Sequence, residues 1–111
     1  MSNGKYFAIM MNREQVIKQE IRRQLEKVGE DLKGYTVILF GSRAAGCAHE
    51  RSDFDVGIIG QQPISLSTFY HIEDLFDAMD TLYTIDWVDL NRASPSFRQE
   101  AMKTMEILYA N

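Results

Sequence analysis

Cysteine, histidine and basic residues are scarce in this sequence. Cys47 is the single cysteine among 111 residues, so an internal disulfide is impossible and a reducing cytoplasm is the simplest setting. The two histidines, His49 and His71, lack metal-ligand spacing with Cys47, which argues against a zinc site. Lys and Arg number 12 against 16 Asp and Glu, and the resulting net charge of −4 argues against a nucleic-acid binder.

Long apolar runs are also missing. No uninterrupted apolar segment approaches the length of a membrane span, and no charged, apolar, small-residue series resembles a cleavable signal. We therefore expect a cytoplasmic protein without a membrane partner. A length of 111 residues predicts one domain and leaves no room for a separate substrate domain. We assign this domain to residues 12–111 and treat residues 1–11 as a candidate flexible extension.

The most informative stretch reads YTVILFGSRAAGCAHERSDFDVGII, from Tyr35 to Ile59. Its residues Thr36 to Phe40 are apolar or β-branched without alternation, which predicts a central strand covered on both faces. Gly41 permits a sharp turn at the end of this strand. Ser42 is a good N-cap for a short helix, which Gly46 can close.

The turn at Gly41 and Ser42 is a candidate phosphate site. A strand that enters a helix N-terminus through Gly-Ser presents free backbone N–H groups and a hydroxyl, and together these suit a phosphate. Arg43 and Arg51 would add positive charge near the turn. The predicted nucleotide-binding residues are therefore Gly41, Ser42, Arg43 and Arg51.

Two carboxylates, Asp53 and Asp55, open the second strand-like run. The two-residue period of a strand places them on one face, with Phe54, Val56 and Ile58 on the other. Side by side they repel unless a positive charge lies between them, and a pair of divalent cations roughly 3.5–4 Å apart, such as Mg²⁺, is the natural occupant. The simpler alternative is a pair of solvent-facing acids at a strand end. Because these two acids follow a strand that ends in Gly-Ser, the metal site is the favoured interpretation.

The remaining segments predict helices that pack on a sheet. The first helix has Asn12 as its N-cap, the second is capped by Ser65 or Ser67, and the last begins at Ser94-Pro95. Tyr83–Leu90 is rich in strand formers. The apolar stripes are Ile17, Ile21, Leu25, Val28 and Leu32; then Phe69, Ile72, Leu75, Phe76 and Met79; then Phe97, Ala101, Met105 and Leu108. The expected fold is α/β (α+β), with a small mixed or antiparallel sheet and flanking helices.

A third acid is expected on the strand Tyr83–Leu90. Alternation groups Asp86 with Val88 and Leu90, and Asp89 with Ile85 and Trp87, so periodicity does not choose between the two acids.

Gly41-Ser42 followed by Asp53-x-Asp55, with a further acid on a later strand, resembles the nucleotidyltransferase superfamily that includes DNA polymerase beta. The wording FGSRAAG…SDFDVGI is similar to the minimal nucleotidyltransferases, the MntA-like antitoxins encoded beside HEPN-domain toxins. The resemblance implies the nucleotidyltransferase fold and selects Asp89 as the third acid, because the family wording is Val-Asp-Leu. The sequence departs from the family pattern at Ala45, where the family often has a basic residue.

The resemblance implies nucleotidyl transfer from ATP, with two Mg²⁺ ions held by Asp53, Asp55 and Asp89 as metal-binding and catalytic residues. The acceptor it implies is a tyrosine hydroxyl on a HEPN-type toxin, whose RNase activity adenylylation would silence. Two alternatives stay open. One is a catalytically idle antitoxin that acts by binding alone, and the other is a small-molecule nucleotidyltransferase of the aminoglycoside type.

Overall fold

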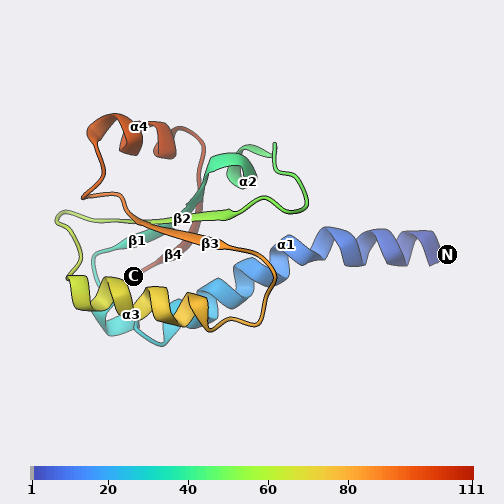
Figure 1. Cartoon of the computed structure of the whole chain (residues 1–111), viewed down its shortest axis with the longest axis horizontal. Helices are drawn as coiled ribbons and strands as arrows, with labels where there is room; N and C mark the ends of the chain where they lie inside the picture. Colours follow the sequence, from blue (N-terminus) through green and yellow to red (C-terminus); the bar gives the residue numbers. More distant parts are fainter. Residues whose placement is uncertain (1) are drawn as a thin grey trace.

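The computed structural model describes the backbone of residues 2–111 and the side chains of residues 13–111. A four-stranded sheet is flanked by helices, in the mixed α/β architecture that the sequence predicts (Figure 1). The elements are α1 (Ser2–Glu26), the 3₁₀ helix η1 (Gly29–Leu32), β1 (Thr36–Phe40), α2 (Gly41–Ala45), β2 (Phe54–Ile59), α3 (Leu66–Asp77), β3 (Ile85–Asp89), α4 (Pro95–Lys103) and β4 (Glu106–Ala110).

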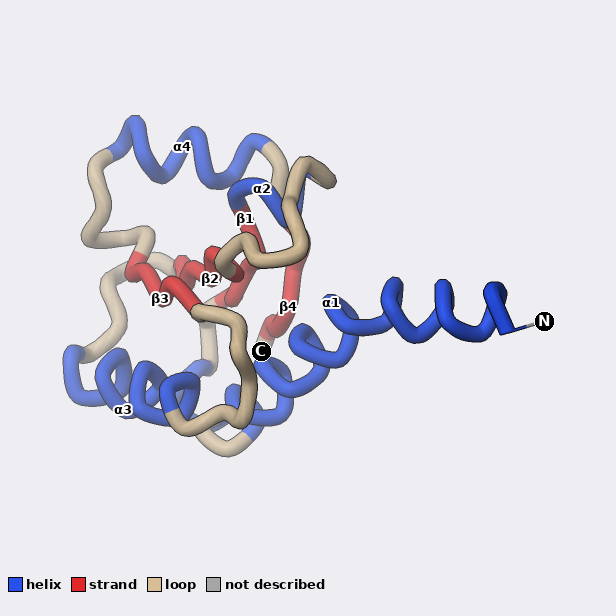
Figure 2. Tube along the Cα trace, turned by 45° about the vertical axis from the view of Figure 1, so that its right-hand side comes forward, coloured by secondary structure: helices blue, strands red, loops and turns tan. Residues whose placement is uncertain are grey.

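The sheet has the strand order β3-β2-β1-β4, so β1 is central, as its unbroken apolar run predicts. It is antiparallel to both β2 and β4, whereas β2 and β3 are parallel. Helices α1 and α3 cover one face of the sheet, and α4 lies over the other (Figure 2). The parallel pairing of β2 and β3 places the starts of these two strands side by side.

Two apolar cores lie on opposite faces of the sheet. The larger one packs Val37, Leu39 and Phe54 against α1 and α3, and the smaller one packs Ile38 and Phe40 against α4. Phe54, Val56 and Ile58 all belong to the larger core, as their spacing predicts. Since side chains alternate along a strand, Asp55 lies on the α4 face of the sheet.

Helix α1 begins earlier than predicted. Its backbone is helical from Ser2, so Asn12 lies inside the helix and the prediction of an N-cap there is wrong. Met1 lies outside the described residues. The first half of α1 extends beyond the rest of the domain (Figure 1). Neither α1 nor any other helix in residues 2–111 combines the length and the apolarity that a membrane crossing requires.

The last helix ends earlier than predicted. Helix α4 is capped by Ser94 with Pro95 in its first turn, as expected, but it stops at Lys103 because Thr104 adopts an extended conformation. Met105 and Leu108 are therefore not on a helical stripe. Residues 106–110 form β4, which pairs with the free edge of β1 and buries Leu108 in the larger core. Tertiary pairing overrides the helical period here.

Candidate active site

The turn after β1 places Gly41 against a carboxylate from the next strand. Gly41 has φ +73°, and a Cβ atom at this position would overlap Asp55 Oδ2. Only glycine fits this backbone without strain. Helix α2 starts at Gly41 itself, with Phe40 as its N-cap, so the prediction that Ser42 is the N-cap is wrong. Gly46 closes α2 in a left-handed conformation, as predicted. Ser42 thus lies in the first helical turn, beside the free N–H groups.

A Gly41→Ala substitution tests this close approach. We expect a loss of roughly 10²-fold or more in the nucleotidyl transfer that the resemblance implies, because the added methyl group must displace Asp55 or the turn and misplaces the reacting groups. Gly34, whose φ is +84° with open space around it, offers a matched control. Gly34→Ala carries the same backbone strain far from the carboxylates and should lower Tm without lowering the transfer rate. Equal transfer rates in the two variants would contradict the assignment of Gly41 to the active site.

Three acids gather at the start of β2 and β3. Asp55 lies directly opposite Asp86 in the parallel register of the two strands, and Asp53 immediately precedes β2. Burial raises the pKa of Asp55, and the charges of Asp86 and Asp53, together with a hydrogen bond to Asp86, raise this pKa further. Asp55 is therefore the acid on which both neighbouring carboxyl groups act.

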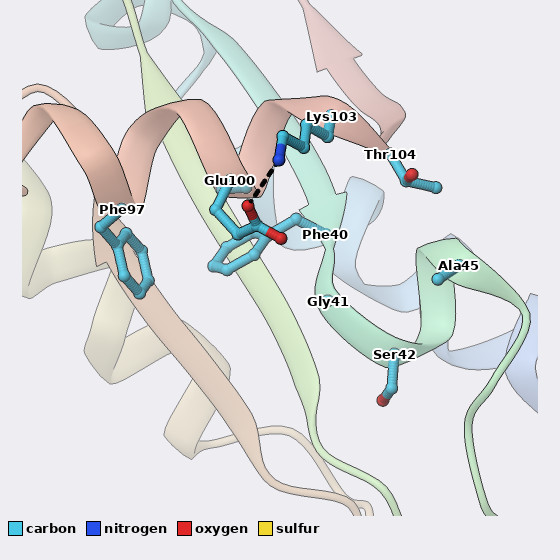
Figure 3. Close-up of a pocket in the computed structure, with 9 residues that line it drawn as sticks. Phe40, Gly41, Ser42, Ala45, Phe97, Glu100, Lys103 and Thr104 are labelled. Atoms are coloured by element: carbon cyan, nitrogen blue, oxygen red, sulfur yellow. Dashed lines mark ion pairs between the residues drawn. The ribbon is translucent and has the colours of Figure 1, made fainter.

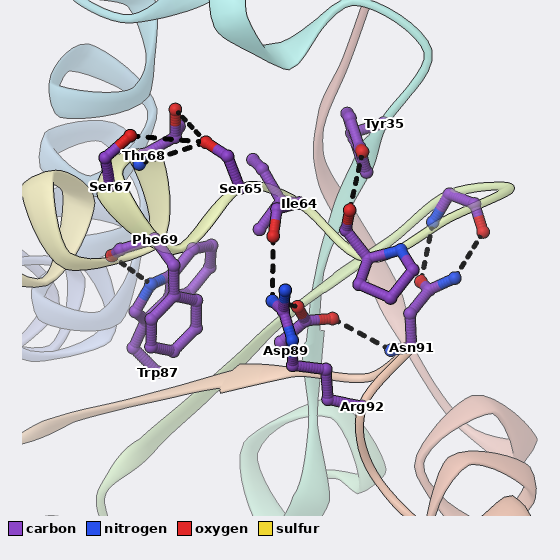
Figure 4. Close-up of polar contacts among 12 residues, drawn as sticks. Tyr35, Ile64, Ser65, Ser67, Thr68, Phe69, Trp87, Asp89, Asn91 and Arg92 are labelled. Carbon is purple, nitrogen blue, oxygen red and sulfur yellow. Dashed lines mark hydrogen bonds and ion pairs between the residues drawn. The ribbon is translucent and has the colours of Figure 1, made fainter.

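Asp89 does not join these acids, which corrects the prediction that selected it. Its side chain is 6% exposed and accepts a hydrogen bond from Arg92 Nη1 at 2.6 Å through Oδ2 and one from the Asn91 backbone N–H at 3.0 Å through Oδ1. The same Arg92 nitrogen donates to the Ile64 carbonyl at 2.7 Å (Figure 4). Asp89 therefore anchors the link before α3 to the end of β3. Alternation puts Asp89 and Asp86 on opposite faces of the sheet.

Arg43 is also placed differently from the prediction. Its side chain is 7% exposed, and its guanidinium donates hydrogen bonds to the loop that precedes β2 instead of projecting toward the turn at Gly41 and Ser42. Arg51 is exposed and lines a separate hollow of about 840 Å³ with Arg13, Glu50, Leu82 and Tyr83. The structure therefore brings neither arginine into the pocket beside the turn.

An open pocket of about 410 Å³ lies between α2 and α4. Figure 3 shows Phe97, Glu100 and Lys103 of α4 on one side, and Gly41, Ser42 and Ala45 on the other. The Lys103 ammonium is 3.0 Å from a Glu100 carboxylate oxygen, and both side chains are largely exposed. Lys103 is a basic residue of the site that sequence reasoning missed, because a lone lysine at the end of a helix gives no signal.

The donor chemistry of the acid cluster fits a hard cation. The charge of Asp86 raises the pKa of Asp55, so a cation between these two acids would offset their repulsion, and carboxylate oxygens are the ligands that Mg²⁺ prefers. Among the described side chains, residues 13–111, no three acidic, histidine or cysteine groups already converge as a metal site. The Asp55–Asp86 pair is therefore the part of the cluster that could hold a metal ion.

Comparison with known proteins gives a family match over most of the chain. The family model described as polymerase beta, nucleotidyltransferase matches residues 19–111. The probable protein adenylyltransferase MntA of Haemophilus influenzae is 31% identical over 74 residues, which are 67% of this chain and 65% of that protein. The chain thus aligns with slightly less than two thirds of this relative's length.

Solved structures share the fold at lower identity. A crystal structure of a toxin–antitoxin pair with AMP-PNP has a TM-score of 0.62 at 23% identity, covering 85% of this chain and 73% of that chain. A structure of tri-AMPylated Shewanella oneidensis HEPN toxin in complex with an MNT antitoxin has a TM-score of 0.56 at 20% identity, with the same coverage. Because the family model spans the turn at Gly41 and Ser42, the acid cluster and the whole sheet, this chain belongs to the polymerase beta nucleotidyltransferase family.

Proposed function

We propose that this protein is a magnesium-dependent nucleotidyltransferase that transfers AMP from ATP to a tyrosine hydroxyl of a HEPN-type toxin, acting as the antitoxin of that pair. The observation that carries the proposal is the approach of Asp55 both to Gly41 in the turn and to Asp86 on β3. Carboxylates beside a helix N-terminus with free N–H groups suit a metal-bound nucleoside triphosphate.

The turn and the pocket would bind the nucleotide. In this proposal the backbone N–H groups of Gly41 and Ser42 and the Ser42 hydroxyl hold the β- and γ-phosphates. The pocket between α2 and α4 accepts the rest of the donor. Asp55 and Asp86, with Asp53 beside them, would hold Mg²⁺, and the cation would neutralise charge on the α-phosphate and on the departing pyrophosphate.

The acids also supply a proton acceptor. Asp86 is exposed on an edge strand, whereas Asp55 is half-buried on the neighbouring strand. An incoming hydroxyl therefore reaches Asp86 more easily, and Asp86 takes its proton. The hydroxyl oxygen then forms a bond to the α-phosphorus, the bond from that phosphorus to the bridging oxygen breaks, and pyrophosphate leaves. We assign the third catalytic acid to Asp86 in place of Asp89.

The acceptor is proposed from the relatives. The Haemophilus influenzae protein is named a probable protein adenylyltransferase, and the Shewanella oneidensis complex pairs an MNT antitoxin with an AMPylated HEPN toxin. This chain has the same fold, and its strands form a single four-stranded sheet. A partner chain that supplies the acceptor fits this arrangement, and the reducing cytoplasm is the compartment that we propose for the pair.

The test is the intact mass of the HEPN-type partner after incubation with this protein, Mg²⁺ and ATP. We expect a mass gain of one or more AMP units, followed by peptide mapping of the modified tyrosine. The Asp53→Ala/Asp55→Ala variant should form the same complex and give no gain. A stable complex that never gains mass with any nucleotide would replace transfer by inhibition through binding alone. Transfer to small acceptors but not to the partner would favour a small-molecule enzyme.

Lys103 is expected to replace the basic residue that Ala45 does not provide, because both residues line the same pocket. Lys103→Ala should raise the KM for ATP by roughly 3- to 10-fold with little change in kcat, as expected for one partly exposed charge. Lys33→Ala is a matched control, since Lys33 forms a similar exposed pair with Glu30 at 3.1 Å. Steady-state kinetics would contradict the role of Lys103 if both variants behaved like the unmodified protein.

A further inference from the structure

We propose that Arg43 is a positioning residue, and that its one side chain holds the phosphate-binding turn, Asp53 and the strand that carries Asp86 in register. This inference rests on the proposed function. It differs from the expectation that Arg43 binds the nucleotide, because the guanidinium is already occupied by the protein.

The guanidinium of Arg43 binds the backbone just before the acids. Nη2 and Nε donate to the Ser52 carbonyl at 2.7 and 3.1 Å, and Nη2 also donates to the Glu50 carbonyl at 3.1 Å. Ser52 immediately precedes Asp53. Arg43 itself immediately follows Gly41-Ser42. One side chain thus joins the turn directly to the peptide that carries the first acid.

The flat face of the same group packs on two aromatic rings. The guanidinium carbon lies 4.1 Å from the centre of the Phe54 ring and 5.1 Å from that of Tyr83. Phe54 lies between Asp53 and Asp55, and Tyr83 precedes β3, three residues before Asp86. The two rings also contact each other edge to face at 5.4 Å. Arg43 therefore contacts the residue between Asp53 and Asp55 and a ring three residues before Asp86.

A carboxylate from α1 balances the buried charge. Glu14 Oε1 accepts a hydrogen bond from Arg43 Nη1 at 3.1 Å. A buried guanidinium without a counter-ion would be costly, so Glu14 allows Arg43 to occupy this place. Lysine cannot substitute, because a single ammonium group lacks the planar fork that donates to two carbonyls and stacks on the rings at once.

Positioning of this kind should appear in kcat. Small displacements of reacting groups lower the rate of in-line transfer strongly, whereas binding of the nucleotide depends on other groups. We expect Arg43→Lys to lower kcat by roughly 10- to 100-fold and to change the KM for ATP by less than about 3-fold. Millimolar guanidinium should restore part of the kcat of Arg43→Ala, and ammonium should not.

The matched control is Arg13→Ala. Arg13 pairs with Glu50 of the same loop at 2.9 Å, but this pair is exposed and lies outside the acid cluster. We expect kcat and KM to stay at the unmodified values. If Arg43→Lys raised the KM for ATP tenfold or more and left kcat unchanged, Arg43 would instead be a nucleotide-contacting residue. Unchanged kcat with only a lower Tm would reduce it to a structural residue.

Hydrogen exchange of the protein without metal or nucleotide separates this inference from the proposed function. In Arg43→Lys we expect faster exchange confined to residues 41–46 and 49–54, with the rest of the sheet unchanged. If the unmodified protein transfers no nucleotide, the proposed function fails, yet this local increase would still establish the link made by Arg43. Exchange that is unchanged in both segments, or faster throughout the sheet, would overturn the inference.

Discussion

Asparagine in place of Asp55 is expected to abolish nucleotidyl transfer and, at the same time, to stabilise the metal-free protein. The loss should be roughly 10²- to 10³-fold or greater, because Asp55 is the acid that contacts both Gly41 and Asp86. Removing one of two repelling carboxyl groups should raise the Tm by a few degrees, because solvent screening weakens the repulsion at this partly exposed position. Activity and stability would then change in opposite directions.

The stability difference should depend on pH. The pKa of Asp55 in the folded protein lies above its ordinary value of 3.8, mainly because of burial and then because of the charges of Asp86 and Asp53. The contribution of Asp55 to the stability of the folded protein is therefore fully present only below pH 3.8. This contribution is lost as the pH rises through the folded-state pKa. The Tm advantage of Asp55→Asn should be small at low pH and should grow as the pH rises through that window.

Thermal unfolding with and without Mg²⁺ measures this effect. Mg²⁺ should raise the Tm of the unmodified protein and have little effect on Asp55→Asn, because the variant has lost a ligand. Asp77→Asn, an exposed acid at the end of α3, serves as the charge-matched control. A metal-free Asp55→Asn protein that is less stable than the unmodified one would contradict the repulsion between these acids.

Substitutions of the two acids of β3 are expected to have different effects, one on nucleotidyl transfer and the other on stability. Asp86→Asn should lose transfer by roughly 10²-fold or more while the Tm stays the same or rises slightly, because Asp86 is exposed and its charge no longer repels Asp55 opposite it. Asp89→Asn should keep the transfer rate of the folded protein but lose about 1–3 kcal/mol of unfolding free energy. The amide keeps one acceptor oxygen for the half-buried Asn91 N–H, but it places an NH₂ group against Arg92 and removes the charged partner of that guanidinium.

Urea unfolding and single-turnover transfer, measured on both variants, separate the two roles. Each variant is the control for the other, since both replace one carboxylate by an amide on the same strand. A catalytic defect in Asp89→Asn at full folding, with normal transfer by Asp86→Asn, would restore Asp89 as the third acid. The family wording Val-Asp-Leu would then have identified the third acid correctly, although the β2–β3 register places Asp86 opposite Asp55.

Local patterns predicted the faces of β2 and two of the helix caps, whereas the caps predicted at Asn12 and Ser42 were wrong. The alternation in Phe54–Ile59 separated the core residues from Asp55, and the caps at Ser65 and Ser94 were readable from residue type. The helical stripe at the C-terminus failed at Met105 and Leu108. Leu108 is buried under either assignment, and only the free edge of β1 decides that its segment is a strand.

The sequence by itself determined the α/β class, the turn at Gly41 and Ser42, and the placement of Asp55 on the face opposite Phe54. These features depend on the period of a strand and on the conformational freedom of glycine, and both are local properties. Only the tertiary structure decided that Asp86 joins Asp55, that Asp89 binds Arg92, and that Arg43 turns into the loop. Each of these depends on strand register or on partners distant in the chain, which residue spacing does not contain.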